Sequence, residues 1–312
     1  MNRPLSLLAA LLLAAPLSAP LAADAATPPL VDAAWLKANA DDVAVIDLQA
    51  PKAFQRFHIP GVVNLPYSVW RTQAPKDNKD PSVLASMMPP VERLATMLGQ
   101  SGIGNDDHVV IVATGQGAGD LAAAARVYWT FKVLGHDAVS VLDGGLQVYA
   151  NAGGRLVQGT GRRAAKTFAA NPRPELAPDA AAVQQLMADG AQMVDARSEG
   201  EFVGLYTGDG DERPGTIPGA RHLPFDWVAA ADGTASLRSG GALRQLFDAR
   251  GIDPAAEQVH FCHSGNRAAL TWFAAYAVLG NKDAKLYDGS MMEWAQRDDL
   301  PVASEIELCD AC

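Results

Sequence analysis

Cysteine and histidine are scarce in this chain of 312 residues. The three cysteines are Cys262, Cys309 and Cys312, and there are six histidines in all. No recognisable metal-ligand spacing connects the four histidines that lie away from residue 262, which are His58, His108, His136 and His222. The sequence therefore offers no metal site, and no cofactor is expected.

The chain also lacks a long basic block and a second long apolar run. It has 25 Lys and Arg residues and 35 Asp and Glu residues, which gives a formal net charge of -10. Nucleic acid is therefore not expected as a partner, although a local cationic pocket can still hold a small anion. Beyond the N-terminal segment no apolar stretch has the length of a membrane span, so no membrane partner is expected once that segment is removed.

The N-terminal segment has the composition of a secretory signal peptide. Arg3 precedes a Leu- and Ala-rich stretch over residues 5–21, and Ala23-Asp24-Ala25 provides an A-x-A cleavage pattern. The alternative, an uncleaved amphipathic anchor, needs a charged face that this stretch lacks. Residues 1–25 are therefore predicted to be removed, and the mature protein to be periplasmic or secreted.

The rest of the chain contains an internal repeat. Corresponding segments are 45–48 and 193–196, the Ile-Pro-Gly turns at 59–61 and 217–219, and the Leu-Gly pairs at 134–135 and 279–280. A repeat of this length predicts two domains of similar architecture. The predicted divisions are domains at 27–157 and 175–308, a basic Gly- and Pro-containing linker at 158–174, and a tail at 309–312.

Each copy alternates short apolar runs with helical patterns. In the first copy, strands are predicted at Val43–Leu48, Val109–Ala113 and Ser140–Leu142, and helices at Pro90–Gln100 and Leu121–Leu134. Such alternation is typical of the α/β class, in which a parallel sheet carries helices on both faces.

The second copy places Cys262 between a strand and a helix. An apolar run over residues 259–261 leads into Cys262, a polar turn containing Gly265 follows, and a helical pattern begins near Ala268. Backbone N–H groups at such a helix N-terminus stabilise an anion such as a thiolate. At a repeat offset of 148 residues, Thr114 occupies the matching position in the first copy, whose loop is about three residues longer. The alternative, a buried core thiol, does not account for the polar turn.

These motifs resemble the tandem-domain sulfurtransferases of the rhodanese family, which include the thiosulfate and 3-mercaptopyruvate sulfurtransferases. The resemblance covers nearly the whole mature chain and rests on the order of the strand ends at Asp47 and Asp195, both Ile-Pro-Gly turns, and residues 141–146, 262–267 and 287–294. It implies two α/β domains, each with a five-stranded parallel sheet and helices on both faces. It also implies that the first domain is inactive, in agreement with its lack of cysteine.

The resemblance assigns Cys262 the role of catalytic nucleophile. It implies a small anionic sulfur donor, a persulfide held on Cys262, and a thiol or cyanide acceptor. The substrate-binding candidates are Arg197, His263, Ser264, Gly265, Asn266 and Arg267. His263 can either steady the thiolate or face solvent. Arg197 can either bind substrate or form a salt bridge with Glu199 or Glu201.

The loop sequence is compatible with two sulfur donors. Thiosulfate is the first choice and 3-mercaptopyruvate is the second. Glu201 stands where better-studied rhodaneses carry a second arginine. Arg213 can either compensate for that missing arginine or have a structural role. Ser264 resembles the residue that mercaptopyruvate enzymes carry in this loop. Arg267 resembles the residue that single-domain thiosulfate enzymes carry there. We expect a monomer or a weak dimer.

A phosphatase of the same fold is the main enzymatic alternative. Those enzymes place five residues between cysteine and arginine, whereas Cys262 and Arg267 enclose four. The smaller ring favours a sulfur atom over a phosphate group.

The C-terminal cysteines suggest a further alternative. Cys309 and Cys312 can form a disulfide in an exported protein, which leaves Cys262 unpaired. One hypothesis is that the protein is a periplasmic persulfide carrier or redox partner, in which a reduced tail thiol attacks the Cys262 persulfide, releases sulfide and leaves a disulfide between Cys309 and Cys312. The simpler alternative is a terminal disulfide or an idle pair.

Overall fold

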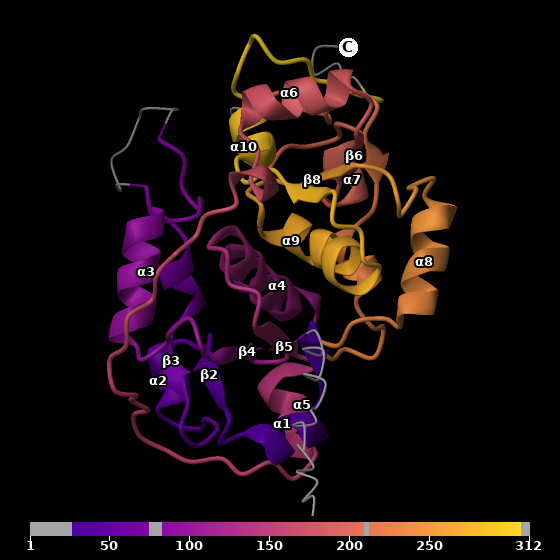
Figure 1. Ribbon diagram of the computed structural model, residues 1–312. Coiled ribbons are helices and arrows are strands. Elements are labelled where there is room, and N and C mark those ends of the chain that lie inside the picture. Colours follow the sequence, from indigo (N-terminus) through magenta and orange to yellow (C-terminus); the bar gives the residue numbers. More distant parts are fainter. Residues whose placement is uncertain (1–26, 75–82, 209–211, 307–312) are drawn as a thin grey trace, which may run out of the picture.

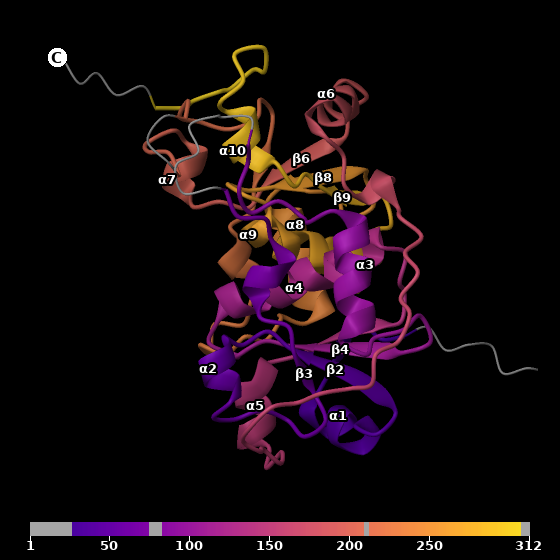
Figure 2. The same ribbon diagram turned by 90° about the vertical axis from the view of Figure 1, so that its left-hand side faces the viewer.

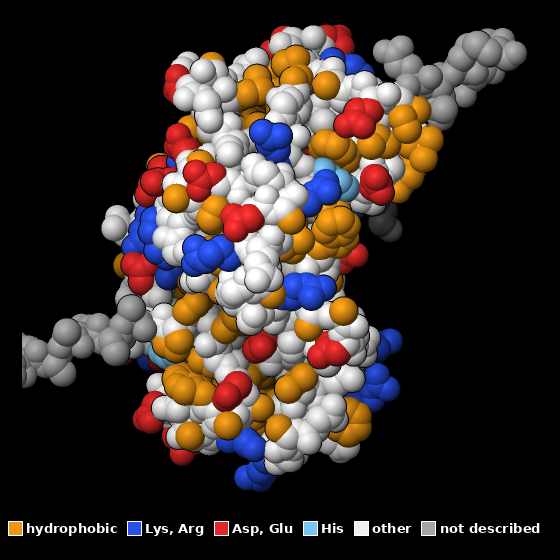
Figure 3. Space-filling view, turned by 90° about the vertical axis from the view of Figure 1, so that its right-hand side faces the viewer, with side chains coloured by type: hydrophobic (Ala, Val, Ile, Leu, Met, Phe, Trp, Pro, Cys, Tyr) orange, Lys and Arg blue, Asp and Glu red, His pale blue; other side chains and the backbone are white. Residues whose placement is uncertain are grey.

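The computed structural model describes residues 27–74, 83–208 and 212–306, which form two α/β domains in chain order (Figure 1). The predicted signal segment, Cys309 and Cys312 lie outside these residues. Within them, no helix combines the length and apolar character needed to cross a membrane. Acidic and basic side chains are interspersed on the face shown in Figure 3.

The first domain is built on a five-stranded parallel sheet with the order β1-β5-β4-β2-β3. Its strands are β1 (Leu30–Val31), β2 (Val43–Asp47), β3 (Val63–Asn64), β4 (His108–Val112) and β5 (Val139–Leu142). Its helices are α1 (Ala33–Asn39), α2 (Pro51–Phe54), η1 (Tyr67–Trp70), α3 (Val91–Gln100), α4 (Ala118–Val133) and α5 (Gly145–Asn151). Alternate residues of β2 pack on opposite faces, Val43 and Val45 toward α1 and α5, Ala44 and Ile46 toward α3 and α4.

The second domain repeats this plan with four parallel strands in the order β7-β6-β8-β9. Its strands are β6 (Gln192–Asp195), β7 (Arg221–His222), β8 (Gln258–Phe261) and β9 (Ala284–Leu286). Its helical segments are η2 (Pro174–Leu176), α6 (Ala180–Ala188), α7 (Glu199–Phe202), η3 (Phe225–Val228), α8 (Gly240–Ala249), α9 (Asn266–Phe273), the π-helical η4 (Ala274–Val278) and α10 (Ser290–Trp294). Helices α6 and α10 cover one face of the sheet, and α8 and α9 cover the other.

The fifth strand expected in the second domain is absent from its described residues. In the first domain, Val31 pairs with β5 immediately before the helix cap Asp32. The equivalent cap in the second domain is Asp179, and the residue before it is Pro178. Because proline has no backbone N–H, this segment cannot form the same ladder beside β9.

Helices α4 and α9 lie between the two sheets in both ribbon views (Figures 1 and 2). Tyr128 on α4 meets Phe273 on α9 edge to face, with ring centroids 4.8 Å apart. The buried side chains of both helices belong to one continuous hydrophobic core. Residues 158–173 form neither helix nor strand and run along the first domain, where the Lys166 N–H donates to the Gly99 carbonyl at 2.9 Å.

Strand register changes the alignment of the two central loops. Asp47 pairs with Val112 in the first sheet, and Asp195 pairs with Phe261 in the second. The next residues, Ala113 and Cys262, are therefore equivalent, and the expected match of Cys262 with Thr114 is wrong by one position. Four residues separate Ala113 from α4 and three separate Cys262 from α9, so the first loop is longer by one residue rather than three.

The loop of the first domain contains its own anion. The Asp120 carboxylate accepts hydrogen bonds from the backbone N–H groups of Gly115 at 3.0 Å and Gln116 at 2.9 Å. This side chain satisfies N–H groups in the loop just before α4 that would otherwise need another acceptor. The first domain therefore fills its loop with a fixed carboxylate.

We predict that Asp120→Ala lowers the free energy of unfolding by about 1–3 kcal/mol, because two backbone N–H groups lose a charged acceptor. Urea unfolding monitored by tryptophan fluorescence measures the change. Asp41→Ala is the matched control, since Asp41 is exposed. Equal stability of the two variants would contradict this role of Asp120.

Candidate active site

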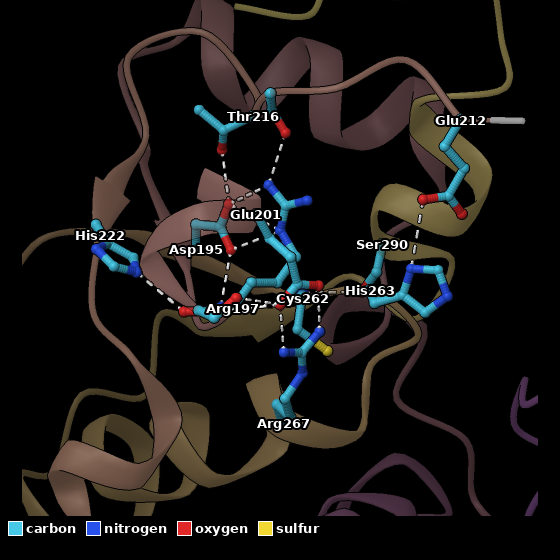
Figure 4. A network of polar contacts seen from close by, with 12 residues as sticks. Asp195, Arg197, Glu201, Glu212, Thr216, His222, Cys262, His263, Arg267 and Ser290 are labelled. Carbon is cyan, nitrogen blue, oxygen red and sulfur yellow. Dashed lines mark hydrogen bonds and ion pairs between the residues drawn. The ribbon is translucent and has the colours of Figure 1, made fainter. Parts of the chain in front are cut away.

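Cys262 follows β8 directly and lies one short loop before α9. It is buried, with 1% of its surface exposed, and is a free cysteine. Its carbonyl accepts a hydrogen bond from the Met291 N–H at 3.0 Å, as the Ala113 carbonyl does from Leu146 in the first domain. The thiol is thus held at the carboxyl end of the central strand, where parallel sheets present their functional groups (Figure 4).

Ser290 organises the loop from the neighbouring segment. Its hydroxyl oxygen accepts the N–H groups of Cys262 at 3.2 Å and Gly265 at 3.0 Å, and its hydroxyl donates to the Tyr287 carbonyl at 2.8 Å. Ser290 adopts φ 52°, whereas the first domain has Gly145 at φ 60° in the same place. Serine accepts this glycine-favouring conformation because its hydroxyl makes three hydrogen bonds.

The rest of the loop presents backbone donors. Gly265, at φ 72°, turns the chain into α9 and supplies the last residue before the helix. Among the described residues, no acceptor meets the N–H groups of Ser264, Asn266 and Arg267. These N–H groups and the positive end of α9 can stabilise negative charge on or near Cys262.

Arg267 forms a bidentate ion pair with Glu201, which occupies the position where an arginine was expected. Nη1 and Nη2 donate to the two carboxylate oxygens, each at 2.7 Å. The Ser198 hydroxyl donates to the same carboxylate at 2.7 Å and closes a capping box on α7. Burial raises the pKa of Glu201, but the hydrogen bonds from Arg267 and Ser198 outweigh burial and lower the pKa to about 2.

The same pair acts on Arg267. Burial lowers the pKa of the Arg267 guanidinium, whereas the Glu201 carboxylate and negative charge at Cys262 raise it further than burial lowers it. Arg267 is therefore close enough to Cys262 to interact electrostatically with it, but its positive charge is matched by Glu201.

Arg197 forms an ion pair, but not with either of the glutamates expected from the sequence. Its guanidinium donates to Asp195 at 2.7 Å and to the Gly215 carbonyl at 2.7 Å, and it is 3% exposed. Thr216 donates a further hydrogen bond to Asp195 at 2.7 Å. The partner of Arg197 is therefore Asp195, rather than Glu199 or Glu201.

The side chains of Arg213, His263 and His260 interact with other parts of the second domain. Arg213 donates to four backbone carbonyls around residues 294–300. The His263 ring is turned toward Glu212 and away from the Cys262 sulfur (Figure 4), with Nδ1 3.5 Å from Oε2. Burial lowers the pKa of His260 to about 3, so this histidine is neutral inside the core.

The first domain reaches the loop with side chains that sequence reasoning missed. The Tyr67 hydroxyl donates to the Asn266 side-chain oxygen, and Arg126 forms an ion pair with Asp288. The Met88 N–H donates to the same Asp288 carboxylate at 2.7 Å. No local sequence pattern marks these residues, because their roles arise from the packing of one domain on the other. No group of His, Cys, Asp and Glu side chains within the described ranges is arranged to hold a metal ion.

Comparison with known proteins identifies the family. The model of the rhodanese-like domain matches residues 32–152 and again residues 179–297. The chain therefore belongs to the rhodanese family and contains two copies of its domain.

Two relatives show how far this similarity extends. A putative thiosulfate sulfurtransferase of Mycobacterium tuberculosis H37Rv is 30% identical over 283 residues, covering 88% of this chain and 96% of the relative. Human 3-mercaptopyruvate sulfurtransferase is 33% identical over 274 residues, covering 86% and 85%.

Solved structures agree with this classification. SseA from Escherichia coli, described as a 3-mercaptopyruvate sulfotransferase of the rhodanese fold, has a TM-score of 0.70 and 26% identity. The match covers 85% of this chain and 99% of SseA. Wild-type EanB, at 21% identity and a TM-score of 0.74, shares the fold over 89% of this chain.

We predict that Glu201→Gln lowers the free energy of unfolding at neutral pH by about 1–3 kcal/mol, because Arg267 loses its charged acceptor. The folded-state pKa of Glu201 lies below its ordinary value, so its contribution is present above the ordinary value near 4.5. That contribution is lost as pH falls through about 2. The stability difference between wild type and variant should therefore shrink over this range.

Urea unfolding at a series of pH values measures this difference. Glu199→Gln is the matched control, because Glu199 is exposed on the same helix. A stability difference that stays constant from pH 7 to the acid limit would contradict the assignment.

Proposed function

We propose that this rhodanese-family sulfurtransferase carries the transferred sulfur as a persulfide on Cys262. The observation that carries the proposal is a buried, free thiol at the N-terminal end of α9, beside N–H groups that have no acceptor among the described residues. Such a position stabilises a thiolate before the reaction and an anionic persulfide after it.

The first half-reaction loads the sulfur. The Cys262 thiolate attacks the sulfane sulfur of thiosulfate, a new S–S bond forms, and the old S–S bond breaks with its electron pair leaving on sulfite. With 3-mercaptopyruvate the C–S bond breaks instead, and the pyruvate enolate takes up one proton. The second half-reaction returns the thiolate when cyanide or a thiolate attacks the outer sulfur.

The loop geometry supports both halves. The N–H groups of Ser264, Asn266 and Arg267 can face negative charge without moving, because Ser290 and the start of α9 hold the backbone in place. Arg267 orients the first turn of α9 through Glu201. Its matched charge makes it a weaker anion receptor than the sequence alone indicated.

For the donor we propose thiosulfate first and 3-mercaptopyruvate second. Relatives named for each donor match most of this chain at similar identity. The acceptor we propose is a thiol or cyanide.

We predict that the mature protein gains the mass of one sulfur atom when it is incubated with thiosulfate or with 3-mercaptopyruvate. The gain should disappear on addition of cyanide, because cyanide removes the outer sulfur as thiocyanate. Intact-protein mass spectrometry measures both steps. Cys262→Ser is the matched control and should gain nothing. A wild-type protein that gains no sulfur from either donor would overturn the proposal, as would a gain that survives in Cys262→Ser.

We further propose that the protein is exported. The Leu- and Ala-rich segment at residues 5–21 and the Ala23-Asp24-Ala25 sequence support this proposal. Expressed in full in a bacterium, the protein should accumulate in the periplasm or medium with an N-terminus near Ala23 or Ala25. Fractionation and N-terminal sequencing measure this outcome, and a cytoplasmic protein that retains residues 1–25 would contradict it.

A further inference from the structure

The cations of the second domain near Cys262 are already partnered. Arg267 is paired with Glu201, and Arg197 with Asp195. Arg213 donates to backbone carbonyls. An arginine side chain that is free to bind an anionic donor beside the loop N–H groups is therefore to be sought in the first domain.

The first domain provides a cation that has no carboxylate partner in the described chain. Arg71 directly follows η1, and its guanidinium carbon lies 5.1 Å from the centre of the Tyr67 ring. Its Nε atom is buried and meets no hydrogen-bond acceptor among the residues that the structure describes. A buried guanidinium N–H without an acceptor is costly, which points to an acceptor that the described residues do not supply, such as a bound anion.

Tyr67 places Arg71 beside the catalytic loop. The Tyr67 hydroxyl donates to the side chain of Asn266, the first residue of α9. Burial raises the pKa of Tyr67, the charges of Arg126 and Arg71 and a side-chain hydrogen bond with Arg71 oppose this rise, and negative charge at Cys262 adds to it. The arginines and the nucleophile therefore act on the same hydroxyl group.

Arg126 adds positive potential beneath the loop. Its guanidinium carbon lies 4.5 Å from the centre of the Trp129 ring, and its Nη1 atom packs directly against Gly265. Nε and Nη1 meet no acceptor, while Nη2 is bound by Asp288. The Arg126 side chain is only 1% exposed, so it cannot contact a sulfur donor directly. Its positive charge can still favour an anion bound at the loop. Arg71 is partly exposed and can make that contact.

We propose that the first domain supplies the anion-binding residue of the active site, with Arg71 holding the anionic group of the sulfur donor while Cys262 attacks its sulfur. This inference rests on the proposed function. The ligand chemistry is an oxyanion joined to the transferable sulfur, the sulfonate-like group of thiosulfate or the carboxylate of 3-mercaptopyruvate. Arg71 is suited to either group, because guanidinium binds planar and tetrahedral oxyanions through paired N–H donors.

The test is steady-state kinetics of Arg71→Gln and Arg71→Lys with each donor. Loss of a charge-assisted hydrogen bond should raise the KM for the donor roughly tenfold to a hundredfold in Arg71→Gln. The value of kcat at saturating donor should change much less, because Arg71 does not touch the sulfur that is transferred. Arg71→Lys should be intermediate, since lysine keeps the charge but loses the fork.

Arg93→Gln is the matched control, because Arg93 is an exposed arginine on α3 of the same domain. A KM increase with one donor only supports the proposal and identifies the anionic group that Arg71 binds. A KM for Arg71→Gln equal to that of Arg93→Gln with both donors would overturn it.

Sulfur loading separates this inference from the proposed function. At saturating donor, Arg71→Gln should still gain one sulfur atom by intact mass, with half-loading at a higher donor concentration than wild type. A wild-type protein that never gains sulfur refutes the Cys262 persulfide itself. Wild type and Arg71→Gln that load at the same donor concentration refute only the role of Arg71.

Discussion

The packing of α4 against α9 is the contact on which the active site depends. It joins the cores of the two domains and brings Arg126 under the turn at Gly265, where a side chain larger than glycine would meet the guanidinium. The ion pair between Arg126 and Asp288 then links the first domain to the segment that carries Ser290. The first domain is therefore part of the structure that holds the Cys262 loop.

The two copies of the domain solve the same electrostatic problem differently. Each has a turn at the end of its central strand whose backbone N–H groups need an anion. The first domain uses the Asp120 carboxylate, which comes from its own helix. The second has Cys262, and Ser290 replaces the equivalent Gly145 so that a hydroxyl can hold the loop. The loss of one internal carboxylate and the gain of one hydroxyl distinguish the loop of the second domain from that of the first.

The sequence predicted the features that depend on local pattern. The repeat, the parallel α/β architecture and the rhodanese family are confirmed. Two predictions failed where backbone hydrogen bonding decided the result, namely the fifth strand beside β9 and the match of Thr114 with Cys262. The pair formed by Glu201 and Arg267 spans 66 positions, and Tyr67 lies 199 positions from Asn266. Contacts at such separations follow from domain packing, which no local motif records.

The division of charge that we propose between the domains also accounts for a loop sequence that fits two kinds of donor. Pairing Arg267 with Glu201 fixes the start of α9 and leaves little positive charge in the loop that follows Cys262. In the proposed arrangement, the loop residues stabilise the Cys262 thiolate, and Arg71 of the first domain binds the anionic group of the donor. A loop sequence that combines features of two enzyme types is compatible with this arrangement, because donor choice no longer depends on the loop alone. Under this proposal donor specificity arises at the domain interface, where a change in the first domain alters donor affinity and leaves the proposed persulfide chemistry at Cys262 intact.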